Sequence, residues 1–322
     1  MDCRSVPGGH TAPKGRRLRL RILKIMKRSF VKLVFFILLL GFAYVILYPF
    51  LFKITAAFMS YDDLFDPMVN LVPENWVLDN FRTVMETENF WAGAVNMMLY
   101  ALVVGVLSTL SAAVVGYGLA RYRFPLRRLV MALVVLTMLV PTQTIKLSLF
   151  STFRYFDLFG LFEGITGQAL QLTNTIWPFV ILSATCLGFR AGIYVILMRQ
   201  YYIGIPRELM EAAHVDGAGP FYTFSHIVLP MAKSMLVVVF ALSFSWQWTD
   251  VFYTGTLSGS KPMLQNIILT MASVSLGGNS DYYYYFVLAN TAALVAIIPL
   301  LLIYVLLQRR IIQGIERSGL VG

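Results

Sequence analysis

Charged residues are scarce in this chain. Lysine, arginine, aspartate and glutamate make up only 13% of the 322 residues, whereas soluble domains hold about a quarter. Apolar residues make up 58% of the chain, and the mean hydropathy is +0.71. The composition therefore predicts a membrane protein rather than a soluble domain.

Cysteine and histidine are also few. Cys3 lies in the N-terminal tail and Cys186 inside an apolar run, so they imply no disulfide framework. His10 is in the tail, and His214 and His226 lie in one loop without the paired spacing of a metal site. We expect no metal and no cofactor. Both loop histidines are interpreted as surface residues, with pH sensing as the alternative.

Catalytic motifs are missing. The chain has no G-x-x-x-x-G-K-[ST] phosphate loop, no H-E-x-x-H and no G-x-S-x-G. GYGLAR at 116–121 lacks the third glycine of a dinucleotide loop. We therefore predict that the chain is not an enzyme, and that any ATPase serving it is a separate polypeptide.

Six apolar runs are each close to the roughly 20 residues that a helix needs to cross a bilayer. They lie near 31–52, 94–118, 129–149, 176–198, 232–253 and 285–307. The first run is too long for a signal peptide and lacks a small-residue cleavage site. The prediction is an all-α membrane protein with six transmembrane helices, made of a basic tail at 1–29 and one membrane domain at 30–322.

Basic residues are concentrated on one side of these runs. Nine lysines and arginines lie in the first 28 residues, whereas the loop after the first run holds seven acidic residues against Arg82. Four arginines fill the connection at 121–128. The positive-inside rule places the tail and this connection in the cytoplasm, and six spans place both termini there.

The net charge of +10 could suggest nucleic-acid binding. The basic residues lie beside the span ends, where anionic lipid head groups attract them by about 1 kcal/mol each. No aromatic-interleaved basic surface accompanies them. We therefore expect membrane lipid as a partner, and no nucleic acid.

A polar segment lies between the fourth and fifth runs. Pro206 suits a helix start, Glu208 and Glu211 suit the positive N-terminal end of that helix, and Gly217 suits the left-handed conformation that stops it. This predicts a helix of about three turns. A second helix, with the apolar stripe Phe221, Phe224 and Val228, is expected to end near Pro230.

The segment carries a recognisable pattern, E-A-A, three residues, G, nine residues, I-x-L-P. Its members are Glu211, Ala212, Ala213, Gly217, Ile227, Leu229 and Pro230. The pattern resembles the EAA loop of the membrane subunits of bacterial ABC importers, which inserts into a cleft of the ATPase subunit and couples its closure to the membrane domain. An ordinary cytoplasmic helical hairpin is the alternative. The resemblance assigns ATPase coupling to the loop at about 204–230, through Glu211, Ala212, Ala213, Asp216, Gly217, Ile227 and Pro230.

The resemblance covers nearly all of residues 30–322. NLVPENWVLDNFRTVM at 70–85, GYGLARYRF at 116–124 and the run at 189–219 are similar to the smaller, six-span permease of maltose-type carbohydrate importers. The C-terminal tail at 308–322 is also similar, although Val321 stands where the family commonly has lysine, which puts a charged tail contact in doubt. The implied fold is the ABC importer type I transmembrane domain, with both termini cytoplasmic.

The resemblance implies a multi-pass subunit of the bacterial cytoplasmic (inner) membrane. By the same resemblance it would import a sugar, specifically an oligosaccharide, by alternating access. The implied partners are a second permease subunit, an ATP-binding cassette ATPase dimer and an extracytoplasmic sugar-binding protein. A permease for another polar solute is the alternative; a channel or a membrane-embedded enzyme lacks support, because no filter-like motif or spaced catalytic pair is present.

Some polar and aromatic residues in the runs are candidates for the substrate path. Polar groups facing hydrocarbon are costly, so we expect them to face protein or a water-filled path. These residues are Asn96, Gln143, Gln247, Asp250 and Asn290. Trp246 and Trp248 suit sugar stacking or interfacial anchoring, and the tyrosines at 282–285 suit an aromatic belt.

Two further features are predicted to serve packing or partner contacts. Gly188 and Gly192 form a GxxxG pattern typical of close helix packing. By the resemblance, the last external loop, at about 254–284, reaches into the binding protein. Within that loop an apolar group, interpreted as a surface for the binding protein, consists of Met263, Leu264, Ile267 and Ile268.

Overall fold

The computed structural model describes residues 14–63, 66–69, 71–275 and 282–319. Within these ranges the chain is helical and forms no extended sheet, only two isolated bridges. The helices are α1 (Lys14–Ala57), α2 (Asp79–Glu86), α3 (Phe90–Arg121), α4 (Arg127–Leu139), η1 (Thr142–Ile145), α5 (Lys146–Arg154), α6 (Leu161–Thr166), α7 (Trp177–Ala184), α8 (Ala191–Ile203), α9 (Glu208–Val215), α10 (Pro220–Tyr222), η2 (Thr223–Val228), α11 (Leu229–Met231), α12 (Lys233–Trp248), α13 (Phe252–Leu257), α14 (Leu264–Ser275) and α15 (Tyr282–Gly319). Cys3, His10 and Val321 lie outside the described residues.

Three of the six apolar runs form single long helices. In the described part of the chain, Met26–Ala57, Phe90–Arg121 and Tyr284–Gly314 are long and apolar enough to cross a membrane, and two bent helix pairs raise the number to at most five. The first, second and sixth predicted spans are therefore continuous. The other three runs are broken helices, and the count of six spans stays a prediction.

The third run breaks at a proline. Residues 127–139 and 142–154 form helical segments that meet at an angle of 97°. Pro141 has no backbone N–H, and its ring disfavours the helical conformation at Val140, which is extended at φ −71° and ψ 119°. The chain therefore turns at this point instead of continuing.

The fourth and fifth runs break for different reasons. Residues 185–190 separate α7 from α8, and Cys186 and Arg190 there adopt left-handed φ angles of 58° and 57°. The helix α12 ends at Trp248, and the short α13 begins at Phe252, two residues after Asp250. At its other end α12 meets residues 220–231 at 76°, just after Pro230.

The helix α3 is the centre of the packing. It contacts α7, α8, α12 and α14, and its two halves belong to two apolar clusters. One cluster surrounds Tyr100 and Trp248, and the other surrounds Met198 and Tyr202. By contrast, α1 packs mainly against α15. Between these two helices, Lys53 Nζ donates a 3.0 Å hydrogen bond to Asn290 Oδ1.

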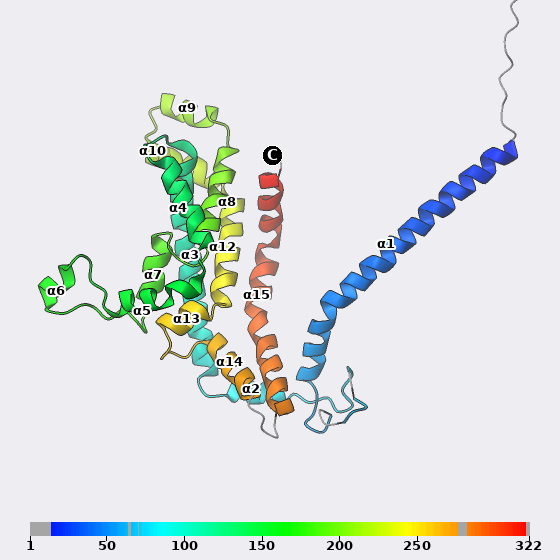
Figure 1. The fold of residues 1–322 in the computed structure, drawn as a ribbon. Coiled ribbons are helices and arrows are strands. Elements are labelled where there is room, and N and C mark those ends of the chain that lie inside the picture. Colours follow the sequence, from blue (N-terminus) through cyan, green and yellow to red (C-terminus); the bar gives the residue numbers. More distant parts are fainter. Residues whose placement is uncertain (1–13, 64–65, 70, 276–281, 320–322) are drawn as a thin grey trace, which may run out of the picture.

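The helices share a clear polarity (Figure 1). The loop helices α9 and α10 lie at one end, and α2 and α14 lie at the opposite end. The first residues of α1 and the last described residues of α15 both lie at the α9 end. Residues 14–29 are part of α1, so the predicted boundary at residue 29 falls inside a continuous helix.

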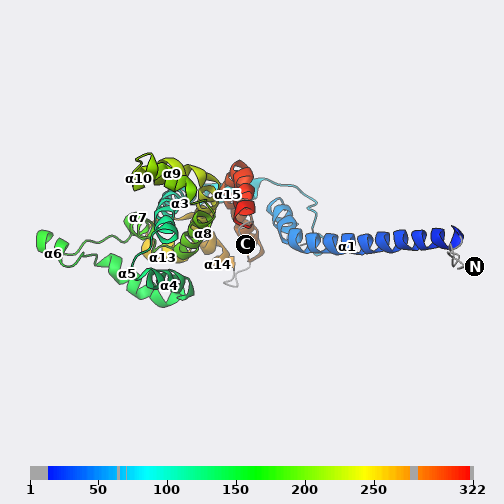
Figure 2. The ribbon, with the colours of Figure 1, turned by 90° about the horizontal axis from the view of Figure 1, so that it is seen from above.

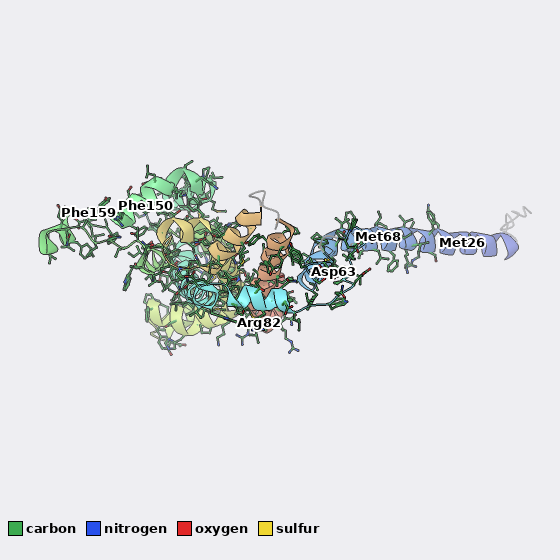
Figure 3. The ribbon with its side chains drawn as sticks, turned by 90° about the horizontal axis from the view of Figure 1, so that it is seen from below. Met26, Asp63, Met68, Arg82, Phe150 and Phe159 are labelled. Carbon is green, nitrogen blue, oxygen red and sulfur yellow. The ribbon has the colours of Figure 1, made fainter. Side chains whose placement is uncertain are left out.

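Two apolar extensions leave the packed centre on opposite sides (Figure 2). One is α1, whose apolar side chains are mostly exposed. The other carries α5 and α6, and the labelled residues Met26 and Phe159 lie on the two opposite extensions in Figure 3. Phe159 is fully exposed. These extensions offer large surfaces that nothing in the described chain covers.

Close approach of helices requires glycine at two positions. A Cβ atom at Gly116 of α3 would lie 2.8 Å from the Met198 Cβ and 3.0 Å from the Arg199 backbone N of α8. At Gly192 of α8, it would lie 2.7 Å from the Val134 carbonyl oxygen of α4. The packing role predicted for Gly192 is therefore confirmed, since only glycine lets these backbones approach so closely.

The α3–α8 contact generates a stability prediction with a matched control. Gly116→Ala should lower the free energy of unfolding by about 1–3 kcal/mol, because the backbone of α8 must move. Gly118→Ala, two residues along the same helix and with nothing within 4 Å of its Cβ position, should be neutral or stabilise by up to about 1 kcal/mol. Thermal unfolding in detergent measures both. Equal effects of the two substitutions would contradict the packing.

Candidate functional site

The loop after α8 forms a helical hairpin at one end of the molecule. Pro206 precedes the N-cap residue Arg207, and α9 then spans eight residues, about two turns rather than the predicted three. Residues 220–231 form a continuous second helix made of α10, η2 and α11. The predicted order of two helices separated by a glycine is confirmed.

Gly217 ends α9 in the conformation that the sequence predicts. Its φ is +81°, in the left-handed region that favours glycine. Its backbone N donates to the His214 carbonyl at 3.1 Å, and the Ala218 N donates to the Ala213 carbonyl at 2.9 Å. These two bonds are a Schellman cap, which satisfies the last carbonyls of α9 and sets the direction of the following chain.

The outer face of the hairpin is uncovered. Glu211, Ala212, Asp216 and Gly217 are exposed, whereas Ala213 is buried against the rest of the hairpin. Ile227 is half-buried, and Pro230 is exposed. The exposed surface also includes Val215 and Phe221, at 87% and 81% exposure. This combination of small, acidic and apolar groups is available to another protein.

The apolar stripe predicted for the second helix is wrong at Phe221. That stripe assumed α-helical spacing, but η2 is a π-helix, in which hydrogen bonds join residues five apart. The buried residues of η2 are Thr223 and Val228, which are five apart. Phe221 consequently points away from the core and joins the exposed face, while Phe224 packs inside.

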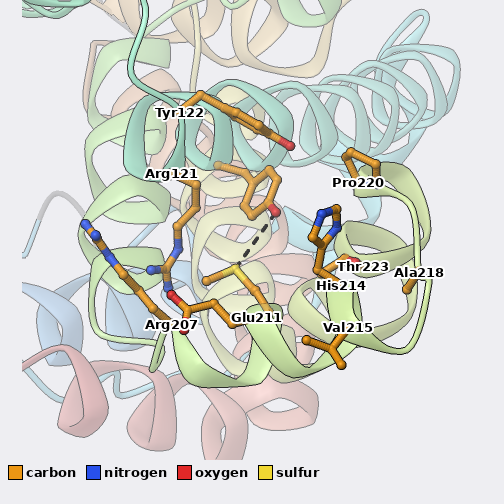
Figure 4. Close-up of a pocket in the computed structure, with 11 residues that line it drawn as sticks. Arg121, Tyr122, Arg207, Glu211, His214, Val215, Ala218, Pro220 and Thr223 are labelled. Atoms are coloured by element: carbon orange, nitrogen blue, oxygen red, sulfur yellow. Dashed lines mark hydrogen bonds between the residues drawn. The ribbon is translucent and has the colours of Figure 1, made fainter.

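The hairpin is tied to the ends of α3 and α8. A cavity of about 470 Å³ lies between α9 and the end of α3, and Tyr122, Arg207 and His214 line it (Figure 4). The Tyr117 hydroxyl donates to Met210 Sδ of α9 at 4.0 Å, the dashed line in Figure 4, and the Tyr117 ring lies 4.8 Å from that of Phe224.

A second tie fixes the segment that leads into α9. The Arg121 Nη2 group, at the end of α3, donates to the carbonyl oxygens of Tyr202 and Ile205. These carbonyls belong to the last turn of α8 and to the link before α9. The segment that leads into α9 is therefore bonded to the end of α3.

A second cavity, of about 500 Å³, lies where the helices break. We name it the break cavity. Its lining residues come from the α4–η1 break, the α7–α8 break and α13, and are Thr137, Met138, Val140, Thr142, Ile145, Leu187, Gly188, Phe189, Arg190, Ile193 and Tyr253. Both α4 and α8 have 13 residues, about 20 Å of helix between the hairpin end and the breaks. Helices of this length are shorter than a hydrocarbon layer about 30 Å thick.

Arg190 is the charged group of the break cavity. Its guanidinium carbon lies 4.3 Å from the centre of the Trp246 ring and 5.0 Å from that of Phe189. Among described residues the one ion pair is Arg82–Glu86 in α2, so Arg190 has no carboxylate partner there. The sequence analysis missed Arg190, although a charge inside a predicted span is a signal of function.

The polar residues predicted for the substrate path face protein. Asn96 donates to the Pro262 carbonyl at 3.0 Å, and Trp248 Nε1 donates to the Ala296 carbonyl at 2.9 Å. Asn290 accepts from Lys53, as described above. Trp246 is half-buried and stacks on Tyr194. Gln143 is the exception, because its side chain is exposed. None of these residues lines the break cavity, so their place in the substrate path stays a prediction.

Two of the predicted path residues have distinct environments. Asp250 is buried and caps α13, accepting bonds from the backbone N of Tyr253 at 3.2 Å and of Thr254 at 2.7 Å. Gln247 is also buried, and its side-chain nitrogen has no hydrogen-bond partner among the described residues. Asp250 therefore has a structural role that is sufficient to explain it, whereas Gln247 has none.

The predicted binding-protein surface is not a surface. Met263 and Leu264 are 0% and 2% exposed and belong to the core cluster around Tyr100, while Ile267 and Ile268 are half-buried. The prediction is wrong for this group because α14 folds back against α3 and α15, using its apolar residues for packing. Tyr284 and Tyr285 likewise pack against this core, and the side chains of residues 282 and 283 lie outside the description.

The broken helices and the exposed hairpin agree with what comparisons with known proteins show. The class of protein is a helical membrane component of a transport system. Residues 112–317 match the model of the family described as binding-protein-dependent transport system inner membrane component. The chain belongs to this family. It is an inner-membrane transport component, not an enzyme, and the resemblance to ABC importer permeases is confirmed.

Relatives with curated names are similar over much of the chain. The alpha-glucoside transport system permease protein AglG of Rhizobium meliloti is 31% identical over 64% of this chain, and the match spans about half, 51%, of that relative. The arabinooligosaccharides transport system permease protein AraQ of Halalkalibacterium halodurans is 31% identical over 71% of this chain and 77% of its own length. The sn-glycerol-3-phosphate transport system permease protein UgpE of Salmonella typhimurium is 29% identical, over 70% and 79%.

A solved structure shares the fold. It is the crystal structure of a bacterial ABC transporter involved in the import of the acidic polysaccharide alginate, with a TM-score of 0.69 and 21% identity. The alignment covers 88% of this chain and 97% of that chain. At this identity the likeness concerns the fold alone.

The role of Asp250 can be tested directly. Asp250→Ala should lower the free energy of unfolding by about 1–3 kcal/mol, because two buried backbone N–H groups lose their acceptor. Asp250→Asn keeps one acceptor oxygen and should lower the free energy of unfolding by less. Thermal unfolding without any substrate measures both. Thr249→Ala, an exposed neighbouring substitution, is the control. Unchanged stability of the alanine variant would leave Asp250 as a path residue rather than a cap.

Proposed function

We propose that this chain is the membrane-spanning permease subunit of an ATP-driven importer for a sugar, most specifically an oligosaccharide. The observation that carries the coupling role is the exposed hairpin with its Schellman cap at Gly217, tied to α3 and α8 by Tyr117 and Arg121. The names of two relatives, which refer to alpha-glucosides and arabinooligosaccharides, support a carbohydrate substrate.

A specific observation keeps a second substrate class open. Arg190 brings a positive charge without a carboxylate partner to the break cavity, and another relative is named for sn-glycerol-3-phosphate. An anionic polar solute would suit such a cavity, because a guanidinium pairs with carboxylate or phosphate. Import of another polar solute is therefore the second candidate function.

The proposed topology has six crossings. We count α1, α3, α4 with α5, α7 with α8, α12 with α13, and α15. The hairpin, the start of α1 and the end of α15 lie at one end of the molecule, which supports a cytoplasmic location for both termini. In this proposal residues 1–29 are a basic tail, residues 30–322 the permease domain, 204–230 the coupling loop and 308–322 a cytoplasmic tail.

The proposed assembly contains a second permease subunit, an ATP-binding cassette ATPase dimer and an extracytoplasmic sugar-binding protein. Glu211, Ala212, Asp216 and Gly217 would enter the ATPase cleft, where an ion pair with Glu211 is shielded from water. Ala213, Ile227 and Pro230 would hold the hairpin in shape. The binding protein would meet the opposite end, near α2 and α14.

The proposed mechanism is mechanical. Closure of the ATPase dimer would move α9, and the contacts of Tyr117 and Arg121 would carry that movement into α3 and α8. Because Arg190 at the N-cap of α8 lines the break cavity, a displacement of α8 would alter that cavity. The cavity would then face one side of the membrane or the other, which is alternating access.

The coupling role predicts specific losses. Gly217→Ala puts a side chain at φ +81°, which costs about 1–2 kcal/mol and should redirect the chain after α9. Glu211→Ala removes the protruding carboxylate. In a reconstituted complex, both should lower uptake and substrate-stimulated ATPase activity at normal membrane levels.

Matched controls separate coupling from general damage to the loop. Gly219→Ala affects a glycine with an ordinary φ of −69° and nothing within 4 Å of its Cβ position, so uptake should be unchanged. Glu208→Ala is the matched control for Glu211→Ala, because it removes another exposed carboxylate of α9. The coupling role fails if Gly217→Ala and Glu211→Ala keep wild-type uptake and stimulation.

The topology makes its own prediction. In a chain whose two native cysteines are replaced, single cysteines at Glu74 and Arg123 should react with a membrane-impermeant reagent from opposite sides. The cysteine at position 74 should react from outside. The cysteine at position 123 should react only after the cytoplasmic face is opened, because acidic and basic loops lie on opposite sides. Labelling of position 123 from outside would overturn the orientation.

A further inference from the structure

Four arginines surround a cavity of about 490 Å³ between the end of α3, the start of α4 and the end of α8. They are Arg123, Arg127, Arg128 and Arg199. We name this the arginine cavity. Arg127 and Arg199 are half-buried, and Arg123 and Arg128 are exposed. It is separate from the cavity beneath α9 and from the break cavity, and the coupling mechanism uses none of its residues.

No acidic side chain lines the arginine cavity. In the part of the chain that the structure describes, none of the four arginines takes part in an ion pair, since the single pair there is on α2. Four like charges repel one another, and half-buried charges are costly unless a counter-charge is close. The arrangement therefore favours a bound anion, and the guanidinium fork matches phosphate oxygens in two-bond geometry.

The backbone adds positive potential at the same place. Leu126 is the N-cap of α4, with φ +64° and no side-chain hydrogen bond to the free N–H groups of the first turn. The 13-residue α4 therefore presents the positive end of its dipole beside the arginines.

The remaining wall of the arginine cavity is apolar. Leu119, Phe124, Leu126 and Met131 complete the lining, and Leu126 is 69% exposed. The cavity is continuous with α4, which has no buried residue and exposes Leu129, Leu133 and Leu136. A free phosphate ion makes no favourable contact with an apolar wall. A phospholipid, in contrast, needs a polar site for its head group and an apolar surface for its acyl chains.

We propose that the arginine cavity binds the phosphate groups of an anionic phospholipid, with its acyl chains along α4. Four arginines favour a lipid with two phosphates, such as cardiolipin, over one with a single phosphate. Only the choice of leaflet rests on the proposed topology, which places this lipid in the cytoplasmic leaflet. The lipid would join α3, α4 and α8 beside the close contact at Gly116.

The test uses the full chain purified in a neutral detergent, with any partner subunits that accompany it. Native mass spectrometry measures binding of added cardiolipin, phosphatidylethanolamine and inorganic phosphate. The variant is Arg127→Gln with Arg199→Gln, the two half-buried members. Arg309→Gln with Arg310→Gln is the matched control, because these exposed arginines near the end of α15 lie outside the arginine cavity.

The wild-type chain should prefer cardiolipin to phosphatidylethanolamine, and the cavity variant should bind cardiolipin about thirtyfold more weakly, from the loss of two basic contacts. The control should change affinity by less than about threefold. Arg127→Lys with Arg199→Lys keeps the charges but loses the two-bond geometry, so its affinity for cardiolipin should lie between those of the wild type and the glutamine variant.

Several results would overturn the proposal. Equal losses in the control would indicate general surface attraction, and unchanged binding in the cavity variant would place the lipid elsewhere. Displacement of cardiolipin by millimolar inorganic phosphate would indicate a free-anion site. A co-purified ATPase subunit that blocks lipid binding at these arginines would assign the cavity to a protein interface.

Discussion

A peptide group that leaves a helix inside a bilayer must find a partner other than lipid, and this constraint organises the whole molecule. Unpaired N–H and C=O groups in hydrocarbon cost several kcal/mol, so helix breaks persist only where protein covers them or a cavity admits polar molecules. Three helices of this chain, α4, α8 and α12, break about 20–24 Å from the hairpin end. The breaks after α4 and before α8 face one cavity.

The distance from the hairpin to that cavity determines how the two can communicate. The helix α8 is continuous from Ala191 to Ile203 and contains Tyr202, whose carbonyl oxygen accepts a hydrogen bond from Arg121. A helix transmits displacement along its axis with little compression, whereas a loop would absorb it. In the proposed mechanism the short, capped α9 and the helix α8 move together, and the close contacts at Gly116 and Gly192 join α8 to α3 and α4.

Sequence reasoning succeeded where the determining interaction is local. Gly217 was predictable because a helix end favours glycine in the left-handed region, and the apolar runs of α1, α3 and α15 need no neighbour to be recognised. Pro141 was also a local signal, but the continuous apolar run around it concealed the bend. Arg190 was missed, although its charge lies within a predicted span.

The rest depended on contacts that no short segment contains. Phe221 was misplaced because the π-helical η2 changes the register, and nothing in its sequence announces that change. Met263 and Leu264 were assigned to a surface because α14 is apolar, whereas its packing between α3 and α15 is a tertiary property. Asp250 was interpreted as a path residue because its backbone partners, at Tyr253 and Thr254, become visible only with the fold.

The distance across the break cavity tests the central claim most directly. Leu187 lines the cavity and Leu139 adjoins it at the end of α4, and both are exposed, so spin labels at these positions can report the separation of the two breaks by pulsed electron resonance. In the reconstituted complex, addition of ATP should change this distance, and hydrolysis should restore it. An unchanged distance in a complex that hydrolyses ATP and transports normally would contradict the account.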